Sequence, residues 1–160
     1  MDVLVKWWFI VWTSIIGAAV AQNYDLFVRL WEVDKTKLSY VILVLFIFVT
    51  ALIGSMAKMS RDESNHQQIR ERLPLYWFST DMMNSLGMIG TVAGFIIMLS
   101  SAFGSNLNVS DIESIKQLIT STAIGLSTAA TTTLVGLICS SIAKLQLVLL
   151  ERVVTNVEEE

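Results

Sequence analysis

Charged residues are clumped along the chain and leave four long windows without Asp, Glu, Lys or Arg: residues 7–24, 38–57, 82–110 and 117–143. About 20 apolar residues cross a bilayer as a helix, with a range of roughly 17–25. None of these windows has the wide polar face that a soluble helix needs, which disfavours a soluble helical bundle. The pattern predicts an all-α integral membrane protein with four transmembrane helices, at residues 6–23, 38–58, 85–104 and 116–144.

The polar stretches outside the windows predict the other segments of a single membrane domain over residues 1–160. We expect a cytoplasmic loop at 59–84, in which the polar stretch SRDESNHQQIRER extends the second helix. Pro74 suits the first turn of a helix, and the aromatic residues Tyr76, Trp77 and Phe78 predict where the third span enters the membrane. After the last span, an apolar stripe predicts a C-terminal helix at 145–160.

The distribution of Lys and Arg predicts the orientation, because both residues are enriched in short cytoplasmic loops. Most of the 11 lie near the termini and in the 59–84 loop: Lys6, Lys58, Arg61, Arg70, Arg72, Lys144 and Arg152. The others belong to the connections at 24–37 and 105–116: Arg29, Lys35, Lys37 and Lys116. This bias predicts a multi-pass protein with both termini in the cytoplasm. The first span ends in GAAVAQN, which mimics a cleavage site, but its tryptophans favour a retained anchor.

Composition supports the membrane assignment and narrows the function classes. Hydrophobic residues make up 54% of the chain and charged residues only 16%, against roughly 25% charged in soluble domains. The net charge of −3 argues against a nucleic-acid partner. Cys139 is the single cysteine and His66 the single histidine, so we expect neither a disulfide framework nor a metal site. No nucleophile–base pair is recognisable, so we expect no enzyme activity and no cofactor.

The four spans are of two kinds. The first two are built from bulky residues, and we expect them to face lipid all round. In the third, Gly90 and Gly94 form a small-xxx-small pair that allows a close helix contact. The last is rich in Ser and Thr between residues 118 and 142. These hydroxyls either bond back to their own helix carbonyls as packing residues or line a route for ions.

No Asp, Glu, Lys, Arg or His lies within the core of any predicted span. Proton pumps and carriers normally have an ionisable group in the membrane, because a moving proton needs an acceptor. The chain is therefore either not coupled to ions, or a helix of a partner supplies the acid.

Two stretches resemble the MotA/TolQ/ExbB family of ion-driven stator and motor subunits. LGMIGTVAGF (86–95) is similar to the third-helix pattern LGxxGTxxG of that family. IGLSTAATTTLVGL (124–137) is similar to its final-helix pattern, GxxxAxxxTxxG, through Gly125, Ala129, Thr133 and Gly136. A competing register places STAIGL (121–126) on the final-helix motif and makes Thr122 the key hydroxyl. The Thr133 register matches more positions without a gap. The order of spans and loops resembles that of the family over the whole chain.

The resemblance implies a homopentameric ring in which the helices at 85–104 and 116–144 line a central pore. It also implies a dimeric partner with one membrane span that bears an Asp, and ion flow past this Asp that rotates the ring. The implied ion is H⁺, with Na⁺ as the alternative, and the implied location is the bacterial inner membrane. The implied pathway residues are Thr91, Thr133, Thr132 and Thr128. The implied helix-packing residues are Gly87, Gly90, Gly94, Gly125, Ala129 and Gly136.

Two departures from the family limit what the resemblance implies. Thr128 stands where some members have Glu, which removes a protonatable group from the pathway. The 59–84 segment is too short for the rotor-engaging domain of flagellar stators, which argues against flagellar torque. The alternative function is a structural or holin-like pore-forming membrane protein that needs no acidic partner.

Overall fold

A computed structural model describes residues 3–23, 34, 36–60, 65–103 and 112–156 of the chain. These residues form four helices: α1 (Val3–Asn23), α3 (Leu38–Met59), α4 (His66–Phe103) and α5 (Ile112–Asn156). The predicted all-α class is confirmed. Most of the connections at 24–37 and 105–116, and the end of the predicted C-terminal helix, lie outside the described residues.

Three of the described helices are long and apolar enough to cross a membrane, namely α3, α4 and α5. This supports the prediction of a multi-pass membrane protein. Helix α1 has 21 residues, but its apolar stretch, Trp7–Val20, is shorter than those of the other three. A fourth crossing by α1 therefore stays a prediction.

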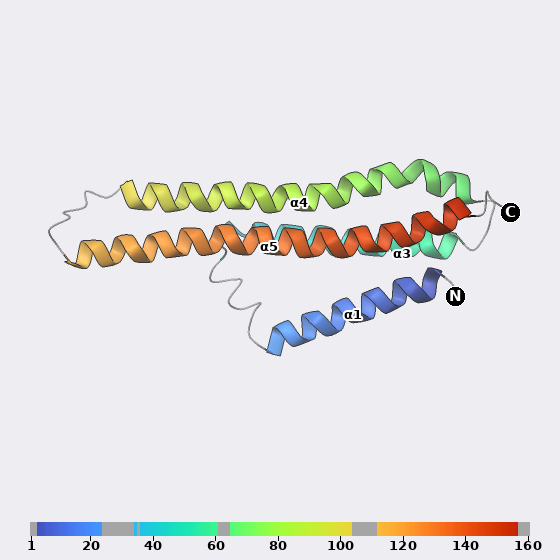
Figure 1. The fold of residues 1–160 in the computed structure, drawn as a ribbon, viewed down its shortest axis with the longest axis horizontal. Helices are drawn as coiled ribbons and strands as arrows, with labels where there is room; N and C mark the ends of the chain where they lie inside the picture. Colours follow the sequence, from blue (N-terminus) through green and yellow to red (C-terminus); the bar gives the residue numbers. More distant parts are fainter. Residues whose placement is uncertain (1–2, 24–33, 35, 61–64, 104–111, 157–160) are drawn as a thin grey trace.

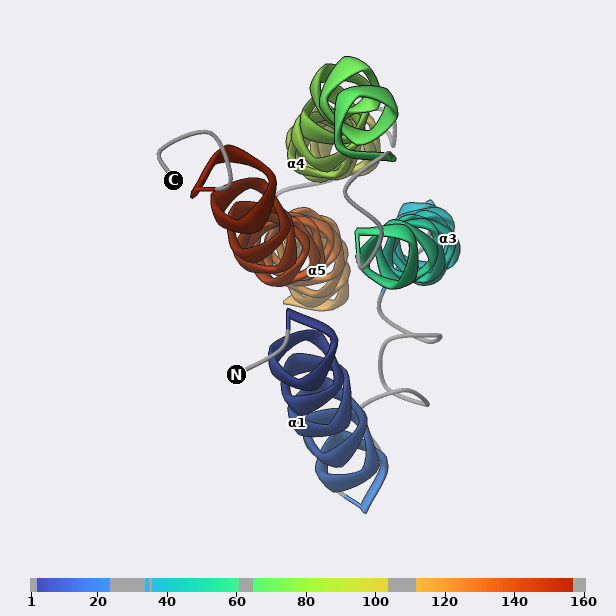
Figure 2. The same cartoon turned by 90° about the vertical axis from the view of Figure 1, so that its right-hand side faces the viewer.

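Helices α4 and α5 run antiparallel, side by side, along most of their lengths (Figures 1 and 2). Helix α3 packs against both of them, so the three helices form a triangle in the end-on view of Figure 2. Helix α1 lies against α5 and α3 on the side away from α4. We call the end of the bundle where α3 ends and α4 begins the His66 end.

The segment predicted as a loop at 59–84 is largely helical, which corrects the sequence analysis. Helix α3 ends at Met59, where the backbone N–H of Ser60 donates to the Met56 carbonyl at 2.8 Å. The chain then starts α4 at His66, so SRDESNHQQIRER does not extend the second helix. Pro74 lies inside α4 instead of starting it. Because proline removes one backbone donor and crowds the preceding turn, it explains the bend of α4 in this part of Figure 1.

A continuous row of buried residues explains why α4 extends through the polar segment. These residues are spaced alternately four and three positions apart: Ile69, Leu73, Tyr76, Thr80, Met83, Gly87, Gly90 and Gly94. This is the spacing of a helix that packs along another at a shallow angle. The buried residues of α5 opposite this row include Ala129, Gly136, Ala143, Leu147 and Leu150. Apart from Thr80, which is buried in the row, the polar residues of 66–84 occupy the other faces of α4 and leave this row intact.

Helix α3 buries one face against α4 and α5, which corrects the expectation that it faces lipid all round. Ile42, Val49, Ile53 and Met56 are at most 4% exposed and belong to the hydrophobic core. The opposite face exposes Val44, Ile47 and other large apolar side chains. Helix α3 therefore has one packed face and one face suited to lipid.

Asp34 organises the start of α3. Its carboxylate accepts hydrogen bonds from the backbone N–H and hydroxyl of Thr36, at 3.0 and 2.6 Å, and from the backbone N–H of Ser39 at 2.8 Å. Burial raises the pKa of this carboxyl, but the hydrogen bonds from Ser39 and Thr36 together lower it below its ordinary value. Asp34 thus satisfies helix-terminal N–H groups that would otherwise have no acceptor.

A tight contact docks α1 on α3. A Cβ atom added to Gly54 would overlap the indole ring of Trp7, at 2.6 Å from its Cη2 atom, so the missing side chain of glycine allows this close approach. Trp7 also packs edge-on against Trp8, with the ring centroids 5.3 Å apart. Among the described tryptophans of α1, Trp8 and Trp12 are exposed.

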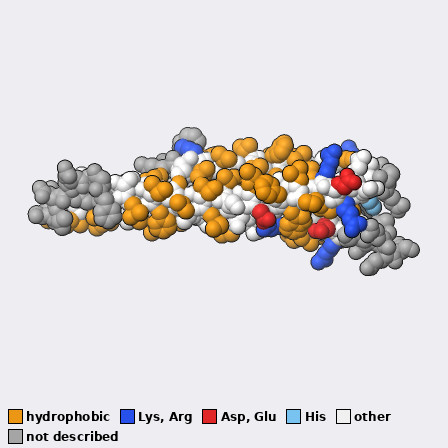
Figure 3. Space-filling model, turned by 90° about the horizontal axis from the view of Figure 1, so that it is seen from above, with side chains coloured by type: hydrophobic (Ala, Val, Ile, Leu, Met, Phe, Trp, Pro, Cys, Tyr) orange, Lys and Arg blue, Asp and Glu red, His pale blue; other side chains and the backbone are white. Residues whose placement is uncertain are grey.

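The surface is divided into an apolar belt and a charged end. In the view from above, hydrophobic side chains cover the middle of the bundle, while most of the visible Lys, Arg, Asp and Glu side chains lie toward the His66 end (Figure 3). This division is the one expected of a bundle whose middle lies in lipid and whose His66 end lies in water.

Candidate functional site

Glycines bring the backbones of α4 and α5 into direct contact. A Cβ on Gly94 would lie 2.7 Å from the backbone nitrogen of Ala129. A Cβ on Gly136 would lie 3.0 Å from the Cα of Gly87, and one on Gly87 would lie 3.3 Å from the Cα of Gly136. A side chain at Gly94 would force the two helices apart, and one at Gly87 or Gly136 would require a shift of a few tenths of an ångström, so the two helices touch through their backbones here.

The same contact continues on both sides of this point. A Cβ on Gly90 would lie 2.6 Å from the Cβ of Thr132, and one on Gly125 would lie 2.6 Å from the Cβ of Met98. The small residues named in the sequence analysis therefore lie together where the two helices meet.

Two hydroxyls from the two helices meet at the edge of this contact. The Thr91 hydroxyl on α4 contacts the Thr133 hydroxyl on α5. Both lie near the Gly87 carbonyl, with Oγ1 to O distances of 3.3 Å for Thr91 and 3.2 Å for Thr133. Thr133 also lies 3.0 Å from the Ala129 carbonyl. Both threonines are half-buried, so two hydroxyl and two carbonyl oxygens gather at a point that is not fully enclosed.

The other threonines proposed for the pathway are placed differently. Thr128 and Thr132 are completely buried. The Thr132 hydroxyl donates to the Thr128 and Ala129 carbonyls, each at 3.1 Å, and the Thr128 hydroxyl donates to Ile124 at 3.0 Å. This is back-bonding within one helix, as packing hydroxyls do. The structure therefore brings the Thr91 hydroxyl to that of Thr133, whereas Thr128 and Thr132 are fully buried.

Thr122, the alternative partner of Thr91, lies farther along α5. It precedes Thr133 by about three helical turns, or about 16 Å at 1.5 Å per residue. In this register Gly125 faces Met98, so Thr122 lies beyond Met98, away from Thr91. The structure thus places Thr133, and not Thr122, beside Thr91.

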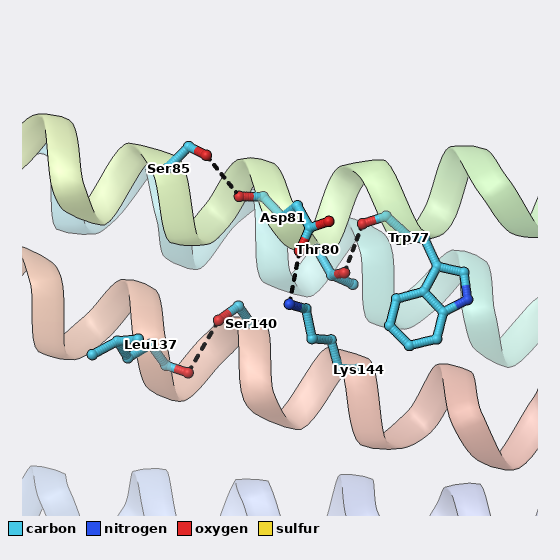
Figure 4. A network of polar contacts seen from close by, with 7 residues as sticks. All are labelled: Trp77, Thr80, Asp81, Ser85, Leu137, Ser140 and Lys144. Atoms are coloured by element: carbon cyan, nitrogen blue, oxygen red, sulfur yellow. Dashed lines mark hydrogen bonds and ion pairs between the residues drawn. The ribbon is translucent and has the colours of Figure 1, made fainter.

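An ion pair that was not predicted from the sequence joins α4 and α5 nearer the His66 end. Lys144 Nζ lies 2.7 Å from Asp81 Oδ1. Figure 4 shows Lys144 reaching from α5 to Asp81 on α4, one turn beyond Ser140. The Ser140 hydroxyl donates to its own helix at Leu137 O, 3.1 Å away. The only signal for the pair was that each residue immediately borders an uncharged window, Asp81 before 82–110 and Lys144 after 117–143.

Neither metal coordination nor known relatives add to this site. Within the parts of the chain that the structure describes, no three His, Cys, Asp or Glu side chains converge as metal ligands would. In comparisons with known proteins, the chain matches no family model, no curated protein and no solved structure.

Proposed function

We propose that the chain is the ring subunit of an ion-driven membrane motor. Five copies surround a pore lined by α4 and α5, and a dimeric partner crosses the pore with one span per copy, each bearing an Asp. Protons flow past this Asp at the ring and drive rotation of the ring around the partner. In this arrangement the chain lies in the bacterial inner membrane with α1 as a fourth span and both termini in the cytoplasm.

The observation that carries the proposal is the contact between the Thr91 and Thr133 hydroxyls at the edge of the α4–α5 interface. Each hydroxyl can donate and accept hydrogen bonds. The pair can therefore hydrogen-bond a water that relays protons, or hold a cation beside a carboxylate. The uncharged windows around both residues contain no acid. A partner carboxylate completes the site, since a proton in the membrane needs an ionisable acceptor.

The proposal is tested with Thr133→Ala in the complex that the tagged chain forms in its native membrane. We expect proton flux to fall by about tenfold, the effect of about 1.4 kcal/mol on a barrier, while the mass of the assembled ring is unchanged. Thr133→Ser keeps the hydroxyl and should restore flux. Thr120→Ala is the matched control, because the Thr120 hydroxyl bonds back to Lys116 on an exposed face.

Three results would contradict the proposal. Equal effects of Thr133→Ala and Thr120→Ala would remove the special role of the hydroxyl pair. Joint loss of flux and ring assembly would make Thr133 a packing residue. Unselective leakage through vesicles that contain this chain alone would favour the holin-like pore.

Replacing Na⁺ by a larger cation at constant pH identifies the coupling ion. Flux that is driven by Na⁺ stops under this change, whereas flux that is driven by protons continues.

A further inference from the structure

A row of polar residues continues from the threonine pair toward the His66 end. On α4, Asn84 precedes Thr91 by seven residues, about two helical turns, so both share a face. On α5, Ser140 follows Thr133 by the same spacing. Asn84 is half-buried and Ser140 is 4% exposed. Polar groups thus border the α4–α5 contact beyond the two threonines.

The Asp81–Lys144 ion pair ends this row. Asp81 lies three residues before Asn84, and Lys144 lies four residues after Ser140, which keeps both on the faces just described. We call these six residues the polar edge: Thr91, Asn84 and Asp81 on α4, with Thr133, Ser140 and Lys144 on α5. In Figure 4 the ion pair is in front of α4 and α5, while α3 lies behind them. The ion-pair end of the polar edge is therefore not covered by α3.

Asp81 is the first carboxylate on α4 that a cation meets on leaving the threonine pair toward the His66 end. The window from 82 to 110 contains no charged residue, and ten residues of helix separate Asp81 from Thr91, about 15 Å. The Lys144 ammonium already occupies this carboxylate at 2.7 Å. A cation that arrives here therefore competes with Lys144.

The exposure of the pair makes this competition possible. Asp81 is 63% exposed and Lys144 is 39% exposed. Water screens exposed ion pairs, so they contribute little to stability. The pair is thus a weak link between the helices, and another cation can replace the ammonium without a large loss.

We propose that Asp81 and Lys144 form an exchangeable cation site at the His66 end of the polar edge, where a monovalent cation replaces the Lys144 ammonium on the Asp81 carboxylate. This inference rests on the proposed function, for which it supplies the inner end of the ion route. Asp81 attracts cations to the polar edge, and Lys144 opposes their entry until it is displaced.

The test measures which charges reach the polar edge, and it needs no partner protein. Cys139 is replaced by alanine, because it is the single cysteine of the chain, and Asn84→Cys is introduced one turn from Asp81. The full-length chain in lipid vesicles is then labelled with cationic and anionic thiosulfonate reagents of similar size. Ile138→Cys, which is 51% exposed on an apolar part of α5, is the control.

We expect Asp81→Asn to lower the ratio of cationic to anionic labelling rates at position 84 by about fivefold, and Lys144→Gln to raise it by a similar factor, as expected for one unit charge at close range in water. Asp81→Glu should keep the ratio. If Asp81→Asn and Lys144→Gln change the ratio in the same direction, or leave it unchanged, the pair only links the helices and the inference is overturned.

The two proposals fail separately. If the native complex conducts protons but the labelling ratio ignores both charge variants, the exchange site is wrong and the proposed function stands. If the ratio responds as expected but the native complex carries no ion flux, the proposed function is wrong and the polar edge is a cation site of another kind.

Discussion

Asp34 is the residue on which the start of α3 depends. Its carboxylate accepts three hydrogen bonds, from the N–H and hydroxyl of Thr36 and the N–H of Ser39. The ionised carboxylate has only acceptor sites, whereas the protonated carboxyl has one O–H donor and fewer acceptor sites. The ionised form is therefore better suited to accept all three hydrogen bonds. The hydrogen bonds therefore lower the pKa of Asp34 below 3.8 in the folded chain, and folding favours the charged form.

The stability of the fold should consequently depend on pH through Asp34. Since the folded pKa is lower than the unfolded one, the stabilisation is complete above the unfolded value of 3.8 and is lost as the pH falls through the folded value. The thermal midpoint of the wild type in detergent, measured from about pH 7 to about pH 3, should fall more steeply than that of Asp34→Asn. At neutral pH the variant should be less stable by about 1 kcal/mol. Parallel curves would show that the Asp34 cap does not contribute.

At the scale of elements, the α4–α5 pair depends on backbone contact. Gly94 meets the backbone of Ala129, an atom group that cannot rotate away as a side chain can. In lipid the hydrophobic effect does not drive helices together, so such van der Waals contacts carry much of the association. Replacing one glycine of this contact therefore weakens the association of α4 with α5 more than the small size of the residue suggests.

Gly94→Ala should destabilise the bundle by about 1–3 kcal/mol, the usual cost of overpacking a tight contact. Gly17→Ala is the matched control, because a Cβ there meets nothing within 4 Å. Alanine is a better helix former than glycine, so this control should be neutral or slightly stabilising. Thermal unfolding of both variants in the same detergent measures the difference. A similar midpoint for both variants would mean that the helices can shift to accommodate a methyl group.

Part of this architecture could be predicted from the sequence because charge clumping and small-residue spacing are local signals. The glycine spacing around Thr91 predicted a close helix contact, and the structure places Gly87, Gly90 and Gly94 in one. The helical nature of 66–84 was missed, because the many polar residues there conceal the spacing of Ile69 and Leu73.

Other features depend on register and orientation, which no local pattern specifies. The choice between Thr122 and Thr133 opposite Thr91 is set by how far α4 slides along α5, and both registers fit the same motif. The Asp81–Lys144 pair joins residues distant in sequence, so neither residue alone indicates it. The single packed face of α3 could not be found either, because its bulky residues are apolar on every side.

The whole molecule leaves a large apolar surface uncovered. Large hydrophobic side chains are exposed on all four described helices, and a shallow apolar hollow on α4 is lined by Met88, Ile89, Val92, Ala93 and Ile96. Lipid or neighbouring subunits can cover such a belt. In the proposed ring, neighbouring copies cover the part near α4 and α5, and lipid covers the rest.

Native mass spectrometry of the detergent-solubilised chain checks this arrangement. Five copies of the 17.8 kDa chain give about 89 kDa before any partner is added, and imaging of the particles should show five-fold symmetry. The complex isolated from native membranes should contain two additional copies of a single-span protein with an Asp in its span. A monomer, or a particle with two-fold symmetry, would contradict the ring and with it the proposed motor.

The contact between Gly87 and Gly136 has a consequence for how this chain can change over generations. At most contacts, a larger residue on one side is tolerated once a smaller one appears opposite. Here each position faces the other's Cα, and no amino acid is smaller than glycine, so neither side has room to compensate. A side chain gained at either glycine is therefore accommodated only if the two helices move apart by a few tenths of an ångström, and not by a smaller residue appearing opposite.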